Sequence, residues 1–161
     1  MLVDLDPEMT SLSQHFPPLG VLNGQAFENP RVQVVNQDAL IWLEQTGEPF
    51  DAAIVDFPDP SNYSVGKLYT TLFYKKLQRR LSPNAGVSVQ CTSPLFARNT
   101  YWCVIRTLEA AGFTVRPYHA AVPSFGVWGF ALCKREPFEI PRTIPSGLQF
   151  LTASTLPVLS P

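Results

Sequence analysis

The sequence is poor in the residues that most often bind transition metals or form disulfides. Its 161 residues include three cysteines and two histidines. Cys91, Cys103 and Cys133 are odd in number and form no C-x-x-C pair, so we interpret them as reduced, buried thiols of a cytosolic protein. His15 and His119 lie far apart in the chain and have no other plausible ligand near them. The sequence therefore predicts no metal site.

Long apolar runs and a strong charge bias are also missing. No run approaches the roughly 18 residues that would span a bilayer, and no charged-then-apolar signal peptide opens the chain. A formal net charge of -1 and a pI near 6.1 show no excess of positive charge that would bind nucleic acid or a membrane surface. We therefore predict a cytoplasmic protein that binds no nucleic acid.

A glycine-rich dinucleotide-binding turn is absent as well. Gly20 and Gly24 are the first of nine glycines, and no G-x-G-x-x-G occurs. Proline, in contrast, is abundant: there are 16 prolines, about twice the usual share. They gather at 17–18, 58–60 and 137–161, which we interpret as loops and a tail.

What is present is an alternation of apolar strands and amphipathic helices. The predicted strands are 1–6, 31–35, 50–55, 87–90, 113–122 and 127–134; the predicted helices are 39–45, 68–81 and 100–111, with a helical turn at 7–13, a loop at 15–30 and a turn at 84–86. This order predicts an α/β fold with a doubly wound, mostly parallel sheet and an antiparallel hairpin strand at its C-terminal end. We expect one domain over 1–134 and a Pro-rich C-terminal tail over 135–161.

Acidic residues follow three successive predicted strands. They are Asp4 and Asp6, then Asp38, then Asp56 and Asp59. Ligands of open α/β sheets bind at the carboxyl ends of the strands, where a carboxylate can accept from ribose hydroxyls. A strand-end aspartate also commonly caps the next helix, so each residue alone has two interpretations.

The stretch Asp56-Phe-Pro-Asp-Pro60 carries the most information. Asp56 and Asp59 lie three residues apart, on a proline-stiffened loop that follows an apolar strand. Such a pair of carboxylates can converge on one small cation. The alternative is an Asx-type turn with two solvated aspartates, and the pattern alone leaves both open.

In order along the chain, several segments resemble the spermidine synthases and related polyamine aminopropyltransferases. The matching segments are 3–7, 29–39, 50–60, 68–74, 81–86, Gln90 and 123–130. Among them, 56–60 is similar to the family's catalytic D-x-x-D-P loop. The resemblance covers residues 1–134 and implies the methyltransferase-like Rossmann fold.

For the sulfonium donor, the resemblance implies that Asp4 binds the ribose hydroxyls of decarboxylated S-adenosylmethionine. Asp38, with Ala39 beside it, would accept from the adenine amino group. The family's first strand, with its G-G-G-D-G turn, has no counterpart in this chain, so we expect the chain alone to be inactive. The strands at 2–6 and 50–55 would then have open edges, and we expect them to pair directly or to form a homo-oligomer.

For the amine, the resemblance implies that Asp56 takes the proton from the attacking nitrogen and that Asp59 holds the substrate ammonium. Gln90 and Phe125 would line the amine site, although Phe125 stands where the family has tyrosine. An alkylamine with a pKa near 10 is almost fully protonated at pH 7, so a carboxylate must deprotonate it before it can attack. The implied function is aminopropyl transfer to a polyamine such as putrescine.

Two other functions remain open. An S-adenosylmethionine-dependent methyltransferase would share the sheet and the ribose and adenine carboxylates, although it would not need two carboxylates for the substrate. A degenerate, non-catalytic domain that binds a metabolite would account for the lost hydroxyl at Phe125. The form of 123–130 resembles that of bacterial members fused to membrane-spanning domains, so we expect a membrane-associated parent protein.

Overall fold

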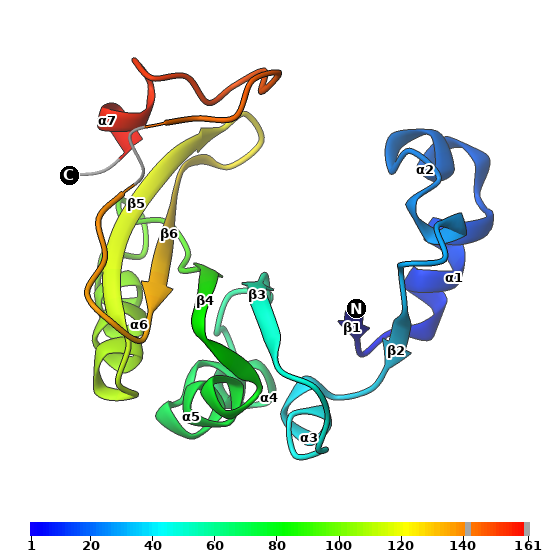
Figure 1. Cartoon of the computed structure of the whole chain (residues 1–161), viewed down its shortest axis with the longest axis horizontal. Helices are drawn as coiled ribbons and strands as arrows, with labels where there is room; N and C mark the ends of the chain where they lie inside the picture. The colour runs from blue at the N-terminus through cyan, green and yellow to red at the C-terminus, as the bar shows by residue number, and fades with distance from the viewer. Residues whose placement is uncertain (141–142, 160–161) are drawn as a thin grey trace. The chain divides into compact units, whose positions relative to one another are not determined.

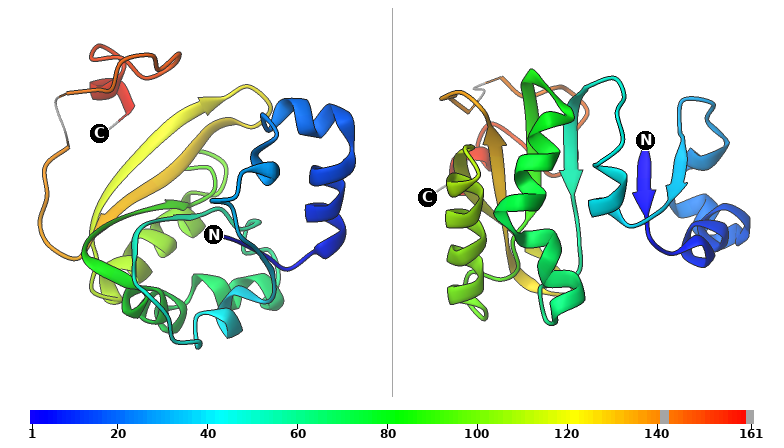
Figure 2. Two further views of the ribbon diagram at one scale, coloured as in Figure 1. Left: turned by 45° about the vertical axis from the view of Figure 1, so that its right-hand side comes forward. Right: turned by 90° about the horizontal axis from the view of Figure 1, so that it is seen from below.

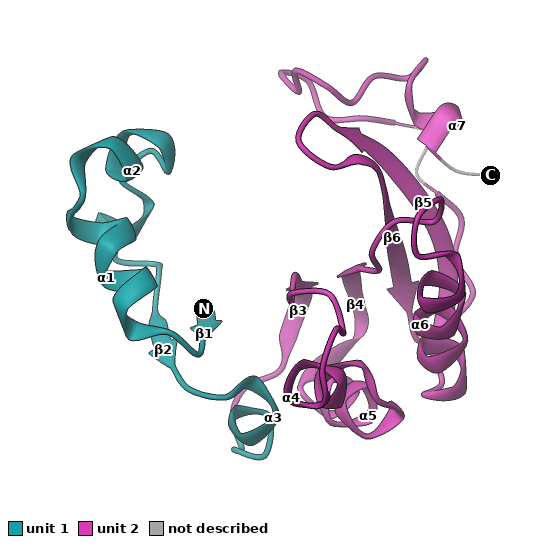
Figure 3. Cartoon of the chain, turned by 180° about the vertical axis from the view of Figure 1, so that it is seen from behind, with its two compact units in different colours: residues 1–46 teal, residues 47–161 magenta. Residues whose placement is uncertain are grey.

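The computed structural model describes residues 1–140 and 143–159. The chain divides into two compact units, residues 1–46 and residues 47–161 (Figure 3). Strands and helices alternate along both units, as the sequence predicts. Within the described ranges, no helix is both long enough and apolar enough to cross a membrane.

The first unit is built on a small parallel sheet (Figure 1). Its elements are β1 (Leu2–Asp4), α1 (Pro7–His15), α2 (Pro17–Leu22), the 3-10 helix η1 (Ala26–Glu28), β2 (Val34–Asn36) and α3 (Ala39–Trp42). β1 pairs with β2, and Asp4 lies opposite Asn36 in the register. Asp6 starts α1, because its side chain accepts hydrogen bonds from the backbone N–H groups of Glu8 and Met9.

The loop predicted at 15–30 is wrong, because this stretch contains α2 and η1. Pro17 and Pro18 occupy the first turn of α2. A proline there loses no helical hydrogen bond, and its fixed φ suits the helix. The prolines therefore start a helix where we predicted a loop. α3, in contrast, is shorter than predicted and ends at Trp42.

The second unit contains a mixed sheet with the strand order β3-β4-β6-β5. Its strands are β3 (Phe50–Val55), β4 (Leu81–Gln90), β5 (Thr114–Val122) and β6 (Gly126–Lys134); its helices are α4 (Tyr63–Gly66), η2 (Lys67–Tyr69), α5 (Thr71–Arg79), α6 (Arg98–Ala110) and α7 (Leu156–Leu159). β3 and β4 are parallel, whereas β6 is antiparallel to both β4 and β5. Figure 2 shows β5 and β6 as a long, curved hairpin, which confirms the hairpin predicted at this end.

The turn predicted at 84–86 lies inside β4 and does not end it. Phe50 of β3 pairs with Leu81, and Ala52 pairs with Gly86. Five positions along β4 thus correspond to two along β3, so the extra residues form an irregularity of the bulge type. The turn-forming residues distort one long strand.

The core of the second unit lies between the sheet and its helices. Its largest fully buried side chains include Phe73 and Tyr74 of α5, Leu108 of α6, and Val87 and Val89 of β4. The Phe73 and Tyr74 rings meet edge to face, with centroids 5.6 Å apart. This core supports the carboxyl ends of β3 and β4.

The three cysteines are free thiols, but they are not all buried. Cys91 and Cys133 are buried, whereas Cys103 is exposed on α6, so the prediction of three buried thiols is wrong for Cys103.

The predicted boundary between residues 134 and 135 stays a prediction. β1 is hydrogen-bonded to β2, and β3 to β4, and each is the terminal strand of its own sheet. The expected pairing or self-association through these strands also stays a prediction.

Candidate functional site

The predicted catalytic loop leaves β3 at the carboxyl edge of the mixed sheet. Val55 pairs in parallel with Val89, so Asp56, which follows β3, and Gln90, the last residue of β4, lie at the same edge. The Asp56 side chain is exposed and forms no hydrogen bond to the residues that the structure describes. Asp59 is partly buried and has a different environment.

Donors from the end of β4 hold the carboxylate of Asp59. The amide Nε2 of Gln90 donates to Asp59 Oδ1 at 2.9 Å. The hydroxyl of Thr92 donates to Asp59 Oδ2 at 2.9 Å. Each carboxylate oxygen can accept more than one hydrogen bond, so both keep capacity for a cationic partner.

A buried tyrosine ties the loop to the same residues. The Tyr69 hydroxyl lies 3.1 Å and 3.2 Å from the carbonyl oxygens of Phe57 and Pro58, and 3.3 Å from Gln90 Oε1. Burial first, and then the negative charge of Asp59, raise the pKa of Tyr69 above its usual value. The hydroxyl therefore stays protonated and acts as a donor.

Phe57 anchors the loop in the core of the second unit. Its ring meets the ring of Phe73 edge to face at 5.4 Å and that of Tyr69 at 6.4 Å. The loop is thus held at Phe57 by packing and at Asp59 by hydrogen bonds. Asp56 projects from a stretch of backbone that is fixed on its C-terminal side.

Tyr69 and Thr92 are not among the site residues predicted from the sequence. Tyr69 lies in the resembling segment 68–74, so that segment held a signal for it. Thr92 carries no motif, and its proximity to Asp59, 33 positions earlier, comes from the tertiary structure. Gln90, predicted to line the amine site, is buried and has Asp59 as its partner.

Phe125 lies in the turn between β5 and β6. Its side chain is 62% exposed, so it is not a core residue. Its ring centroid lies 5.3 Å from that of Trp128. The adjacent segment is tied to the same hairpin, since the Ser93 hydroxyl donates to the carbonyl oxygen of Val127 at 2.9 Å. A role for Phe125 in amine binding stays a prediction.

The residues predicted to bind the donor belong to the first unit. Asp4 ends β1, and its Oδ1 accepts from the N–H of Asp6 at 2.8 Å. Asp38 follows β2 and caps α3, which begins at Ala39; its Oδ1 accepts from the N–H of Leu40 at 2.9 Å. The two parallel strands place both carboxylates at one edge of their sheet. These two hydrogen bonds are those of a turn and a helix cap, and a ligand-binding role stays a prediction.

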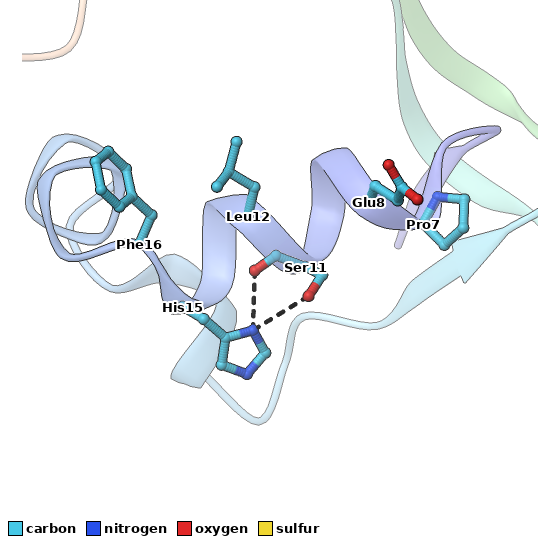
Figure 4. Close-up of a pocket in the computed structure, with 6 residues that line it drawn as sticks. All are labelled: Pro7, Glu8, Ser11, Leu12, His15 and Phe16. Atoms are coloured by element: carbon cyan, nitrogen blue, oxygen red, sulfur yellow. Dashed lines mark hydrogen bonds between the residues drawn. The ribbon is translucent and has the colours of Figure 1, made fainter.

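A separate hollow lies on α1 and contains none of the predicted site residues (Figure 4). In it, His15 Nδ1 lies 2.9 Å from the carbonyl oxygen of Ser11 and 3.4 Å from its hydroxyl. A carbonyl oxygen only accepts, so Nδ1 carries the proton and cannot activate the Ser11 hydroxyl. Among residues 1–140 and 143–159, no group of three or more His, Cys, Asp or Glu side chains could hold a metal ion.

Comparison with known sequences identifies similar proteins. The Spermine/spermidine synthase domain family matches residues 1–143. Polyamine aminopropyltransferase 2 of Ralstonia nicotianae is 53% identical over 156 residues, and Polyamine aminopropyltransferase of Leptospira interrogans is 46% identical over 155 residues. Each match covers 96% of this chain and 31% of the relative, so the chain spans about a third of the length of these relatives.

Comparison with solved structures identifies the fold. A crystal structure of spermidine synthase in complex with the transition-state analogue AdoDATO has a TM-score of 0.72 at 19% identity, covering 84% of this chain and 46% of that one. The spermidine synthase of Thermotoga maritima has a TM-score of 0.69 at 16% identity, covering 84% and 44%. This similarity confirms the predicted α/β fold.

Proposed function

The chain belongs to the spermine/spermidine synthase domain family, and we propose that it supplies the amine-activating residues of a polyamine aminopropyltransferase. Such an enzyme transfers an aminopropyl group from decarboxylated S-adenosylmethionine to a polyamine such as putrescine. The observation that carries the proposal is the contrast between two carboxylates on one loop. Asp59 is held by two donors, whereas Asp56 is exposed and has no hydrogen bond to the described residues.

This contrast suits a substrate with more than one ammonium group. Asp59 has a fixed orientation and keeps its negative charge available, so it holds an ammonium by a charge-assisted hydrogen bond. Asp56 is exposed, and no donor among the described residues occupies its oxygens, so they are open to accept a proton from the bound amine. A neutral substrate would gain nothing from two adjacent carboxylates.

The reaction then needs positioning and negative charge. One N–H proton of the bound ammonium moves to Asp56, which leaves a lone pair on nitrogen. The lone pair attacks the propyl carbon beside the sulfonium; the C–N bond forms as the C–S bond breaks, and the electron pair of that bond returns to sulfur, leaving a neutral thioether. The donor supplies the leaving group, so no covalent nucleophile from the protein is required.

The first unit would hold the nucleoside part of the donor. Asp4 and Asp38 would accept from the ribose hydroxyls and the adenine amino group, with Ala39 beside the base. Their position at the carboxyl edge of β1 and β2 supports this assignment, because nucleotides bind at that edge of open α/β sheets.

The proposal can be tested in a chimaera, in which this chain replaces the matching segment of the Ralstonia relative. We expect methylthioadenosine and an aminopropylated diamine from decarboxylated S-adenosylmethionine and putrescine. The unmodified relative serves as the positive control, and the 161-residue chain alone should be inactive. A methylated product from S-adenosylmethionine would instead identify a methyltransferase. No product from either donor, with methylthioadenosine still bound in calorimetry, would identify a non-catalytic metabolite-binding domain.

A further inference from the structure

We infer that Thr92 is a positioning residue for Asp59 and that its strained backbone aims its hydroxyl at the carboxylate that holds the substrate ammonium. The inference rests on the proposed function, because it assigns Thr92 a part in binding the amine. Thr92 follows β4 at its carboxyl end and is only 2% exposed. Its surroundings explain both its conformation and its partner.

The backbone of Thr92 adopts a conformation that its side chain disfavours. Its φ is +67°, in the left-handed region. A β-branched side chain is an outlier there, because its Cβ substituents crowd the backbone. Such strain persists only where neighbouring contacts enforce it, and it is concentrated at functional sites.

Neighbouring residues enforce this conformation from both sides. The N–H of Thr92 donates to Gln90 Oε1 at 3.1 Å, and its carbonyl oxygen accepts from the N–H of Gly129 at 2.8 Å. Gly129 permits this close approach of β6: a Cβ added there would lie 2.9 Å from the Thr92 carbonyl oxygen and 2.4 Å from the ring of Tyr101. The main chain of Thr92 is therefore clamped.

With its main chain held by Gln90 and Gly129, Thr92 directs its side chain to Asp59. The Thr92 hydroxyl meets Asp59 Oδ2, whereas Gln90 Nε2 meets Oδ1. Two donors on opposite oxygens fix the plane of the carboxylate and leave acceptor capacity on each oxygen. The next hydroxyl along the chain, that of Ser93, donates instead to the carbonyl oxygen of Val127. Of these two neighbouring hydroxyls, it is that of Thr92 that donates to Asp59.

The test compares two substitutions in the chimaera. Thr92→Val keeps the branched shape and removes the hydroxyl, whereas Thr92→Ser keeps the hydroxyl. We expect Thr92→Val to raise KM for putrescine about tenfold, the scale of one hydrogen bond to a charged group, with KM for the donor changed less than about twofold. Thr92→Ser should stay within about threefold of the parent for both substrates. Equal KM values for putrescine in the Val variant and the parent would overturn the inference.

A double-mutant cycle separates positioning from a general structural effect. If Thr92 acts through Asp59, Thr92→Val should have no further effect on KM for putrescine in an Asp59→Asn background. The same fold-change in both backgrounds would overturn the inference.

Thr92→Gly relieves the positive φ and also lacks the hydroxyl. It should raise KM for putrescine as Thr92→Val does, even if the Val variant folds poorly. A parent chimaera that makes no aminopropylated product would refute the proposed function and this inference together, whereas an active chimaera insensitive to Thr92→Val would refute this inference alone.

Discussion

At the scale of single residues, Asp56 and Asp59 have the same side chain but different environments. Asp59 is held by Gln90 and Thr92, and the loop beneath it is held by Phe57. Asp56 lies three residues earlier and lacks such donors among the described residues. One carboxylate is suited to hold a charge in place and the other to exchange a proton. Substitutions at the two positions should therefore affect different kinetic constants.

Replacing Asp56 by asparagine should remove the proton acceptor and keep the shape of the side chain. In the chimaera, we expect kcat to fall roughly 10²–10⁴-fold, with KM for the donor little changed. Asp51→Asn is the matched control, since Asp51 is exposed on β3 and bonds to the Ser82 hydroxyl at 2.9 Å. Steady-state kinetics of both variants measure the effect. Retained turnover in Asp56→Asn would exclude Asp56 as the base.

Replacing Phe125 by tyrosine should leave stability unchanged, because the ring is 62% exposed and the new hydroxyl can reach water. We expect the melting temperature of the chain to change by less than about 2 °C. Phe113→Tyr is the buried counterpart, since Phe113 is 5% exposed and its new hydroxyl would be buried. If Phe125 lines the amine site, the restored hydroxyl should also lower KM for putrescine. A loss of stability as large as that of Phe113→Tyr would mean that the Phe125 ring is packed.

At the scale of elements, three segments far apart in sequence form the candidate amine site. The loop after β3 supplies the carboxylates, the end of β4 supplies the donors, and the start of β6 packs against that end. The Gly129 carbonyl oxygen accepts from the N–H of Cys91 at 2.9 Å, and the Gly129 N–H donates to Thr92. β6 thus extends its pairing with β4 past the last regular residue of β4, and the fit at Gly129 determines where Thr92 lies.

A methyl group at Gly129 should disturb this junction. Gly129→Ala would place a Cβ 2.4 Å from the Tyr101 ring and 2.9 Å from a backbone oxygen, so the strands or α6 must shift. We expect a loss of about 1–3 kcal/mol in the free energy of unfolding, as for overpacked cores. Urea denaturation of the chain measures it. Gly86→Ala is the matched control in β4, since no atom lies within 4 Å of its added Cβ, and it should be neutral within about 0.5 kcal/mol. Equal stability of the two variants would contradict the expected clash.

At the scale of the whole molecule, alkaline pH should destabilise the fold through its buried thiols. Burial raises the pKa of Cys133 from 9.0 to about 12. Burial, and then the neighbouring Cys133, raise that of Cys91 further. Both thiols are neutral in either state below pH 8, so they make stability independent of pH there. Above about pH 9 they ionise only in the unfolded chain, which lowers the free energy of unfolding by about 1.4 kcal/mol per pH unit for each thiol.

Urea denaturation between pH 7 and pH 10 checks this dependence. Cys133→Ala should reduce the decline above pH 9 by the contribution of one thiol, whatever its effect on stability at pH 7. Cys103→Ala should leave the decline unchanged, because Cys103 is exposed. The same slope in wild type and Cys133→Ala would show that the Cys133 thiol also ionises in the folded state.

Local patterns in the sequence determined the elements that carry the site. The apolar run 50–55 is β3 with the predicted bounds, and the predicted strands at 113–122 and 127–134 form the hairpin. The periodic apolar residues of 68–81 predict α5, although its first residue is Thr71. These patterns are readable because strand and helix periodicity depend on neighbours a few residues apart. The motif 56–60 and its resemblance located the paired carboxylates.

Only the tertiary structure decided how the two carboxylates differ. Asp59 meets Gln90 and Thr92 at separations of 31 and 33 residues, and Thr92 depends in turn on Gly129. The helix at Pro17 and the irregularity in β4 were missed because Pro and Gly favour turns locally, while packing and strand pairing determine whether a turn forms. The sequence determined which groups are available near the end of β3, since residue type and local periodicity are properties of short segments. Which carboxylate is held depends on donors brought in from a separate strand end, and only folding brings those together.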